Sequence, residues 1–261
     1  MSLINDVSSF AATIVRLGRG ISPRVTAAQR NGSAPVLELY DFEACPYCRK
    51  VREALCELDL DYLAHPVAHG SPRRDRLIAL GGKMQVPYLV DGTTGTRLYE
   101  SDEIIAYLNA TYGEGQSAGW SLPIPHVLDD LDSMVASAVR LGRGGRYRAP
   151  ARRSPIDPLT LYNMEGSPYC RKVREVLSEL DLEHVVRNVP KGSPKRAELV
   201  ARGGKMQVPY LVDPNTGKEL YESDEIVDYL ETLYGSGTAA VKRRRSAANR
   251  STVRASAAPA G

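Results

Sequence analysis

Apolar and polar positions follow a strand-like and a helix-like period in turn between residues 36 and 113. Short apolar runs bounded by turn residues indicate strands, whereas Val51, Leu55 and Leu58 recur at the spacing of one helix face. We expect strands at residues 36–41, 62–67, 88–90 and 97–99, and helices at residues 46–58, 73–80 and 102–112. The order β-α-β-α-β-β-α predicts an α/β fold, in which a four-stranded mixed sheet has flanking helices on both faces.

The same pattern occurs a second time in the chain. Residues 37–113 align with residues 159–235 at a constant offset of 122, without a gap and with 48 identities over 77 positions. This agreement indicates an internal duplication, so we expect two tandem copies of one domain rather than a longer repeat array.

Residues outside the two copies divide the rest of the chain. The hexapeptide Val-Arg-Leu-Gly-Arg-Gly occurs at residues 15–20 and again at residues 139–144. Each lies at the end of a predicted accessory helix, at residues 9–17 and 127–141. We expect an accessory helix and linker at 1–34, domain 1 at 35–115, a linker with an accessory helix at 116–157, domain 2 at 158–236 and a disordered basic tail at 237–261. Because both copies carry the same accessory helix and near-identical surfaces, we predict that they pack as a pseudo-twofold pair, an intramolecular pseudo-dimer.

Composition limits the classes of function. The 261 residues carry a net charge of +3, but six basic residues and no acidic residue lie in the last 25 positions, so the rest of the chain has a net charge of −3. Nucleic-acid binding by the domains is therefore not expected. No apolar run approaches the length of a membrane span. Residues 8–24 have a composition that a transit peptide could have, although their hexapeptide recurs inside the chain. We expect a cytoplasmic protein, with an organelle stroma or matrix as the alternative.

The four cysteines are too few and too unevenly placed for a disulfide framework, which indicates a reducing compartment. Two of them form Cys45-Pro46-Tyr47-Cys48, where the first predicted strand ends and the first helix begins. A helix N-terminus favours a thiolate, as do the basic neighbours Arg49 and Lys50, so Cys45 is the candidate nucleophile. Cys48 lies one helical turn later and is the candidate resolving thiol.

A Cys-X-X-Cys pair can also bind zinc. That alternative needs two further ligands, and the remaining cysteines and histidines offer no second pair at a usual spacing, so no metal is expected. Cys56 is expected to be a small buried apolar residue of the helix.

Three motifs resemble glutaredoxins and the N-terminal domains of glutathione S-transferases, which are thioredoxin-like proteins. Cys45-Pro46-Tyr47-Cys48 is similar to the glutaredoxin active site. The segments Gln-Val-Pro-Tyr-Leu at 85–89 and Glu-Ser-Asp at 100–102 are similar to the transferase glutathione site, and both recur at 207–211 and 222–224. The resemblance covers essentially all of both copies.

This resemblance implies glutathione, or another low-molecular-weight thiol, as cosubstrate. It implies that the proline of each Val-Pro pair is cis, that the preceding residue binds the cysteinyl part of glutathione through its backbone, and that the Glu-Ser pair binds the γ-glutamyl end. The implied glutathione-binding residues are Tyr47, Gln85, Val86, Pro87, Glu100 and Ser101 in copy 1, and Tyr169, Gln207, Val208, Pro209, Glu222 and Ser223 in copy 2. A helix N-terminus suits a carboxylate ligand, although Ser101 could instead be only an N-cap.

The second copy differs at the reactive position, where Ser167 replaces Cys45 and only Cys170 remains. Dithiol exchange is impossible there, and Cys170, deeper on its helix, should be a poor nucleophile. Ser167 resembles the hydroxyl with which some transferases hold the glutathione thiolate. Copy 2 either binds glutathione without redox turnover or is a degenerate packing partner.

These observations predict a glutaredoxin-like, glutathione-dependent thiol-disulfide oxidoreductase that acts on disulfide substrates. One alternative is a conventional glutathione transferase or isomerase, but residues 116–158 are too short for the all-helical second domain that the transferase resemblance implies. Another is an iron-sulfur cluster carrier that uses glutathione and Cys45, which only the resemblance motivates.

Overall fold

The computed structural model describes residues 20–21, 36–113, 142–149 and 154–236. The predicted accessory helices at 9–17 and 127–141 and the predicted basic tail at 237–261 lie outside the described residues. The division of the chain into five segments therefore stays a prediction.

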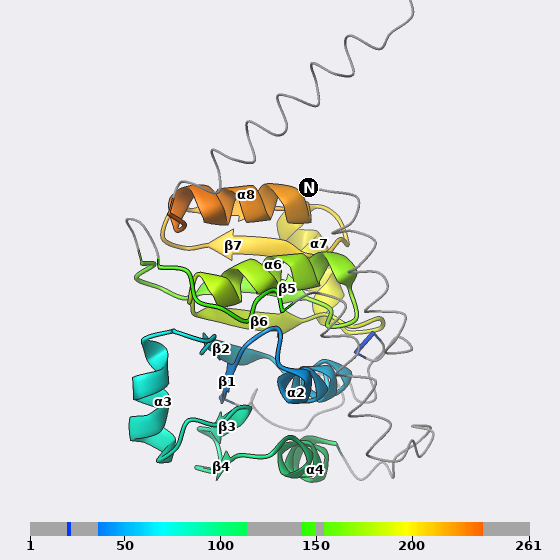
Figure 1. Ribbon diagram of the computed structural model, residues 1–261. Helices are drawn as coiled ribbons and strands as arrows, with labels where there is room; N and C mark the ends of the chain where they lie inside the picture. Colours follow the sequence, from blue (N-terminus) through cyan, green and yellow to red (C-terminus); the bar gives the residue numbers. More distant parts are fainter. Residues whose placement is uncertain (1–19, 22–35, 114–141, 150–153, 237–261) are drawn as a thin grey trace, which may run out of the picture.

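Each copy contains the predicted elements in the predicted order (Figure 1). Copy 1 comprises β1 (Leu37–Asp41), α2 (Pro46–Glu57), β2 (Tyr62–Pro66), α3 (Arg73–Gly81), β3 (Tyr88–Asp91), β4 (Arg97–Leu98) and α4 (Ser101–Tyr112). Copy 2 comprises β5 (Leu159–Asn163), α6 (Pro168–Glu179), β6 (His184–Asn188), α7 (Lys195–Gly203), β7 (Tyr210–Asp213), β8 (Lys218–Leu220) and α8 (Ser223–Leu233). The α/β prediction with two thioredoxin-like domains is confirmed, and element ends differ from the predicted ones by a residue or two.

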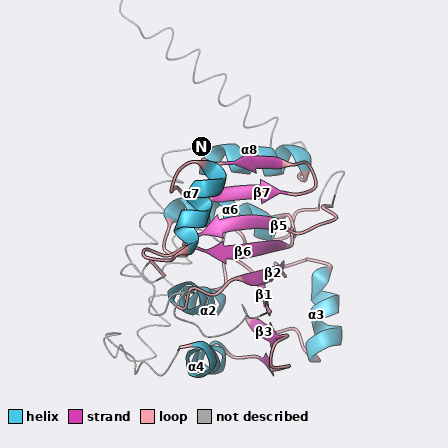
Figure 2. Ribbon diagram, turned by 180° about the vertical axis from the view of Figure 1, so that it is seen from behind, coloured by secondary structure: helices cyan, strands magenta, loops and turns pink. Residues whose placement is uncertain are grey.

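The two four-stranded sheets join edge to edge into one eight-stranded mixed sheet (Figure 2). Its order is β4-β3-β1-β2-β6-β5-β7-β8, and in each half the first two strands are parallel while the third and fourth are antiparallel to their neighbours. The junction is the antiparallel pair β2–β6, in which Leu63 lies opposite Val185. Pairing covers an edge of each half that would otherwise expose unpaired backbone groups.

The helices lie on the two faces of this sheet in a way that the strand pattern explains. Along β1, Leu37 and Leu39 point to the face covered by α2 and α4, while Tyr40 points to the face covered by α3. Val186 of β6 belongs to the same buried cluster as Leu39, so the apolar core continues across the junction. Copy 2 repeats the arrangement with α6 and α8 on one face and α7 on the other.

The repeated hexapeptide ends in a glycine that makes hydrogen bonds with the C-terminal end of a helix in each copy. Gly144 donates its N–H to Glu179 Oε1 at 2.9 Å and accepts a hydrogen bond from Ser178 Oγ at 2.7 Å. Gly20 donates to Glu57 Oε1 at 3.2 Å and accepts from Cys56 Sγ at 3.1 Å. The duplication therefore includes this contact as well as the domain itself.

Replacing Gly144 by alanine should destabilise the protein by roughly 3 kcal/mol or more. Its φ is +75°, and a Cβ would lie 2.6 Å from Glu43 Cβ and 3.1 Å from Glu175 Cα. The matched control is Gly82→Ala, where φ is +80° but nothing lies within 4 Å, so only the backbone cost of about 1–2 kcal/mol is expected. Denaturant unfolding of both variants measures the difference, and equal losses would contradict the close contact at Gly144.

Candidate thiol site and its second copy

Cys45 lies at the N-cap of α2, directly after the turn that follows β1. Its backbone is extended, with φ −73° and ψ 120°, and its Sγ accepts a hydrogen bond from the Cys48 backbone N–H at 3.2 Å. Pro46 suits the first helical position because it has no N–H to leave unpaired there and its φ is already helical. The local sequence therefore places the sulfur where free helix N–H groups stabilise negative charge.

The environments of the two thiols separate their pKa values. A hydrogen bond from the Cys48 thiol has the largest effect on the pKa of Cys45 and lowers it; burial opposes this effect, and the Cys48 N–H and the Arg52 charge add to it. Burial raises the pKa of Cys48 well above that of an ordinary thiol. Cys45 is 5% exposed and Cys48 is fully buried. The pair thus has one thiol prepared to ionise and one that keeps its proton.

Among the largest effects on the pKa of Cys45, the cation is Arg52; the predicted Arg49 and Lys50 are not among these largest effects. The Lys50 ammonium pairs with Asp102 Oδ1 at 2.9 Å. Arg52 lies seven residues after Cys45, which is two helical turns along the same face. That spacing was the signal in the sequence that could have identified it.

The residues implied to bind glutathione lie at the same end of the strands as Cys45. Tyr40, near the end of β1, is paired with Tyr88 at the start of β3, so the turn before Cys45 and the Val86-Pro87 bond lie at the same end of these two strands. Both Val86-Pro87 and Val208-Pro209 are cis. The Lys50–Asp102 ion pair joins the N-terminal parts of α2 and α4.

The Glu-Ser pair has an unusual backbone at the start of α4. Glu100 occupies the N-cap position with φ +63°, and Gln85 Nε2 donates to its Oε1 at 2.5 Å. Ser101 is therefore the first helical residue, and the alternative role of Ser101 as a simple N-cap is wrong. Tyr47 is 44% exposed at the start of α2.

Copy 2 has the same geometry with an oxygen in place of the sulfur. Ser167 Oγ accepts from the Cys170 N–H at 3.3 Å. Gln207 Nε2 donates to Glu222 Oε1 at 2.6 Å, and Glu222 again has φ +63°. Cys170 is fully buried, and burial is the main cause that raises its pKa, which agrees with a poor nucleophile.

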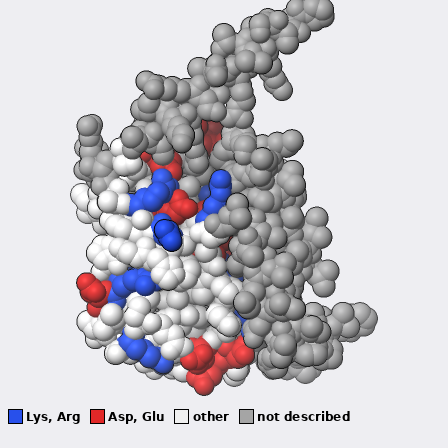
Figure 3. All heavy atoms as spheres, viewed as in Figure 1, with Lys and Arg blue, Asp and Glu red and all other residues white. Residues whose placement is uncertain are grey.

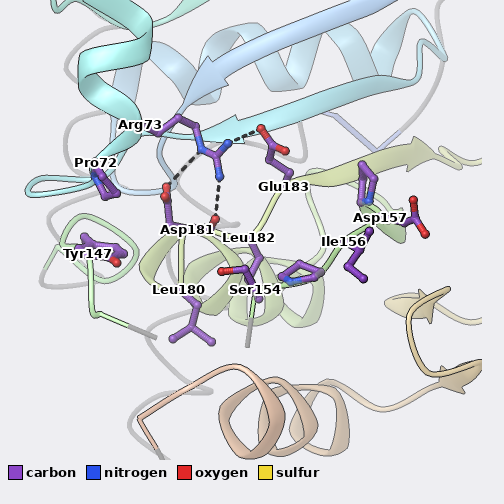
Figure 4. Close-up of a pocket in the computed structure, with 12 residues that line it drawn as sticks. Pro72, Arg73, Tyr147, Ser154, Ile156, Asp157, Leu180, Asp181, Leu182 and Glu183 are labelled. Atoms are coloured by element: carbon purple, nitrogen blue, oxygen red, sulfur yellow. Dashed lines mark hydrogen bonds and ion pairs between the residues drawn. The ribbon is translucent and has the colours of Figure 1, made fainter. Parts of the chain in front are cut away.

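A hollow lies between the copies, beside the start of α3 (Figure 4). The Arg73 guanidinium crosses it, donates to Asp181 O at 2.9 Å and pairs with the carboxylates of Asp181 and Glu183. None of the predicted site residues lines this hollow. Because its cation is already neutralised, we place the candidate site at the starts of α2 and α4 instead.

The described part of the surface carries both signs of charge. On the face shown in Figure 3, basic and acidic side chains lie in small groups with uncharged residues between them. Within the described ranges, no group of three or more His, Cys, Asp or Glu is arranged to hold a metal ion. The described helices include none that is both long and apolar enough to cross a membrane.

Fold and site together define a thioredoxin-like protein with two tandem domains, one with a Cys-Pro-Tyr-Cys motif. The family model described as "Glutathione S-transferase, N-terminal domain" matches residues 39–116 and 161–238, which is more than half of the chain. The chain belongs to this glutathione S-transferase N-terminal domain family.

One relative and one solved structure show how far the similarity extends. The chain is 40% identical over 79 residues to the "Glutathione S-transferase-like protein tpcF" of Aspergillus fumigatus, a match over 30% of this chain and 35% of that protein. It therefore spans about a third of the length of this curated relative. TDR1 of Leishmania, described as a unique trimeric glutathione transferase, is 17% identical, with a TM-score of 0.31 over 78% of this chain and 68% of that one, and at this score the likeness supports no argument.

Proposed function

We propose that the protein is a glutathione-dependent thiol-disulfide oxidoreductase, with Cys45 as nucleophile and Cys48 as resolving thiol. The observation that carries this proposal is the position of Cys45 Sγ at the start of α2, 3.2 Å from the Cys48 N–H, with its pKa lowered first of all by the hydrogen bond from the Cys48 thiol. Family membership supports glutathione as the cosubstrate.

The geometry suits a two-step exchange. The Cys45 thiolate attacks one sulfur of a disulfide, the S–S bond breaks, and the departing thiolate takes a proton from water. Cys48 then loses its proton and attacks Cys45 Sγ, which releases the second thiolate and leaves a Cys45–Cys48 disulfide. Two glutathione molecules reduce that disulfide, lose two electrons together and become glutathione disulfide.

Reduction of a small mixed disulfide of glutathione tests the proposal. The wild-type protein should turn over this substrate only when glutathione is present, with oxidised glutathione measured by a coupled reductase. Absence of glutathione-dependent turnover would remove the proposed function.

In copy 2 we propose glutathione binding without redox turnover, because its backbone and hydrogen bonds repeat those of copy 1. Calorimetric titration with S-methylglutathione, which cannot exchange its thiol, should reveal two sites per chain. Ser101→Ala and Ser223→Ala should each weaken a different one, since each removes the hydroxyl at one helix start. A single site that only Ser101→Ala weakens would make copy 2 a packing partner.

The two copies are proposed to act as an intramolecular pair. The strand order is the same read outward in both directions from the β2–β6 junction, which supports a pseudo-twofold arrangement. Solution scattering should give the profile of one compact body, and a two-lobed profile would contradict the arrangement.

A conjugating transferase is the second candidate, which the family and the relative's printed name favour. The two candidate functions depend on different atoms. The oxidoreductase needs Cys45 Sγ, whereas a transferase would use Ser167 Oγ of copy 2 to hold the glutathione thiolate. Conjugation of an electrophile that persists in Cys45→Ser and is lost in Ser167→Ala would support this activity. We also propose a location in a reducing compartment, the cytoplasm or an organelle stroma or matrix, because the four cysteines are too few and too unevenly placed for a disulfide framework.

A further inference from the structure

Two buried arginines each form an ion pair with a glutamate of the other copy. Arg52 of α2 directs its Nε to Glu165 Oε1 of copy 2 at 3.1 Å, and Arg174 of α6 directs its Nε to Glu43 Oε2 of copy 1 at 3.0 Å. The side chains of both arginines are at most 3% exposed. Each copy therefore supplies one of the carboxylates that hold the other copy's arginine.

The Arg52 guanidinium also binds the turn that leads to Cys45. Its Nη1 lies 3.4 Å from the Phe42 carbonyl oxygen and 2.6 Å from Asp41 Oδ2, while its Nη2 lies 3.4 Å from the Glu43 carbonyl oxygen. The Cys45 N–H donates to the same Phe42 carbonyl at 3.1 Å. Any change in the placement of this guanidinium is thus transmitted to the turn that carries the thiol.

We infer that the second copy completes the thiol site of the first: Glu165 holds the Arg52 guanidinium against the turn that presents Cys45. Arg52 and Glu165 are positioning residues, and the redox-inactive copy is part of the reactive site. The inference deepens the proposed function and rests on it for its biological meaning.

The buried groups around Arg52 and those around Arg174 differ in one side chain. Arg52 donates to Asp41, whereas Arg174 donates to Asn163 Oδ1 at 2.6 Å. The arginines and the glutamates themselves occupy equivalent positions in the two copies. The charged and titratable groups that act on Cys45 are Cys48 and Arg52 from α2 and Asp41 from β1, with Glu43 and Glu165 behind Arg52. The Arg52 charge favours the thiolate, and the Asp41 charge opposes it.

The internal duplication provides a matched set of isosteric variants. Asp41→Asn gives copy 1 the side chain of copy 2, and Asn163→Asp makes the reverse change at the equivalent place. Glu165→Gln removes the charge that copy 2 contributes but keeps an oxygen for Arg52 Nε. Glu165 Oε2 has no hydrogen-bond partner, so the new amide group displaces no existing bond.

The experiment measures the rate of Cys45 alkylation by iodoacetamide against pH in the full chain, with the labelled peptide identified by mass spectrometry. Asp41→Asn should move the midpoint of the profile down by about 1 pH unit, since a buried like charge near the thiolate is removed. Glu165→Gln should move it in the opposite direction and by less, because a neutral amide holds Arg52 less firmly than a carboxylate does and the Arg52 charge then favours the thiolate less. Asn163→Asp should leave it in place.

A Glu165→Gln profile that coincides with the wild-type profile or moves to lower pH would overturn the inference, as would an Asn163→Asp shift equal to that of Asp41→Asn. Alkylation needs neither glutathione nor a disulfide, so the result is independent of the reductase assay. Reductase activity without a Glu165→Gln shift removes only the inference, whereas a shift in an inactive protein removes only the proposed function. Thermal unfolding of each variant confirms that the profiles come from folded protein.

Discussion

Cys45→Ser is expected to reduce the disulfide-reductase rate by about three orders of magnitude or more, because no other described thiol combines a helix N-terminus with a lowered pKa. Cys48→Ser should keep the reduction of glutathione mixed disulfides, which needs only the nucleophile, and lose reactions that need a resolving thiol. Steady-state rates with both substrate types measure the two effects. Cys170→Ser is the control and should leave both rates unchanged.

The reciprocal variant makes this prediction sharper. Ser167→Cys creates a second Cys-Pro-Tyr-Cys motif at an N-cap that already accepts the Cys170 N–H. In the Cys45→Ser background it should restore part of the reductase rate. Full activity of Cys45→Ser alone would show that the chemistry lies elsewhere, and a Ser167→Cys protein without new thiol reactivity would show that the cap is not sufficient.

Arg174→Ala should lower the free energy of unfolding by roughly 3–5 kcal/mol, because it removes one of the two arginines that pair with the buried carboxylates of Glu43 and Glu165. Arg174 lies 3.0 Å from Glu43 Oε2 and 3.1 Å from Glu165 Oε1. The control is Arg202→Ala, which removes an exposed pair with Glu219 and should cost no more than about 1 kcal/mol. Denaturant unfolding at neutral pH compares the two, and similar losses would contradict the importance of burial.

The pH dependence of this loss has a definite sign. Burial by itself would raise the pKa of Glu43, but Arg174 and Arg52 hold it at about 2. A carboxyl whose pKa is depressed in the folded state stabilises the protein above its unfolded pKa and loses that contribution as pH falls through the folded value. The wild type should therefore lose stability between about pH 4.5 and 2, and its advantage over Arg174→Ala should narrow over that range.

The predicted site shows how far local sequence reasoning reaches. Cys45, Pro46 and Cys48 are close in the chain, so the end of a strand and the start of a helix were enough to place the sulfur at a helix N-terminus. The cis bonds at Pro87 and Pro209 agree with what the resemblance implied. Arg52 was missed, because a basic residue on an amphipathic helix usually faces solvent. Its spacing from Cys45 places it on the same helix face, but nothing nearby in the chain indicates that Arg52 is buried there.

The sequence by itself determined the elements of each copy, their order and the duplication, because these depend on the spacing of apolar residues and on turn and cap residues within a short window. Only the tertiary structure decided that β2 pairs with β6, that Arg52 and Glu43 lie in the interior, and that Glu165 reaches the site of Cys45. These contacts join residues more than a hundred positions apart. Their energy depends on which sheet edges meet and which charges lose water together, and neither property is encoded in the local pattern of either copy.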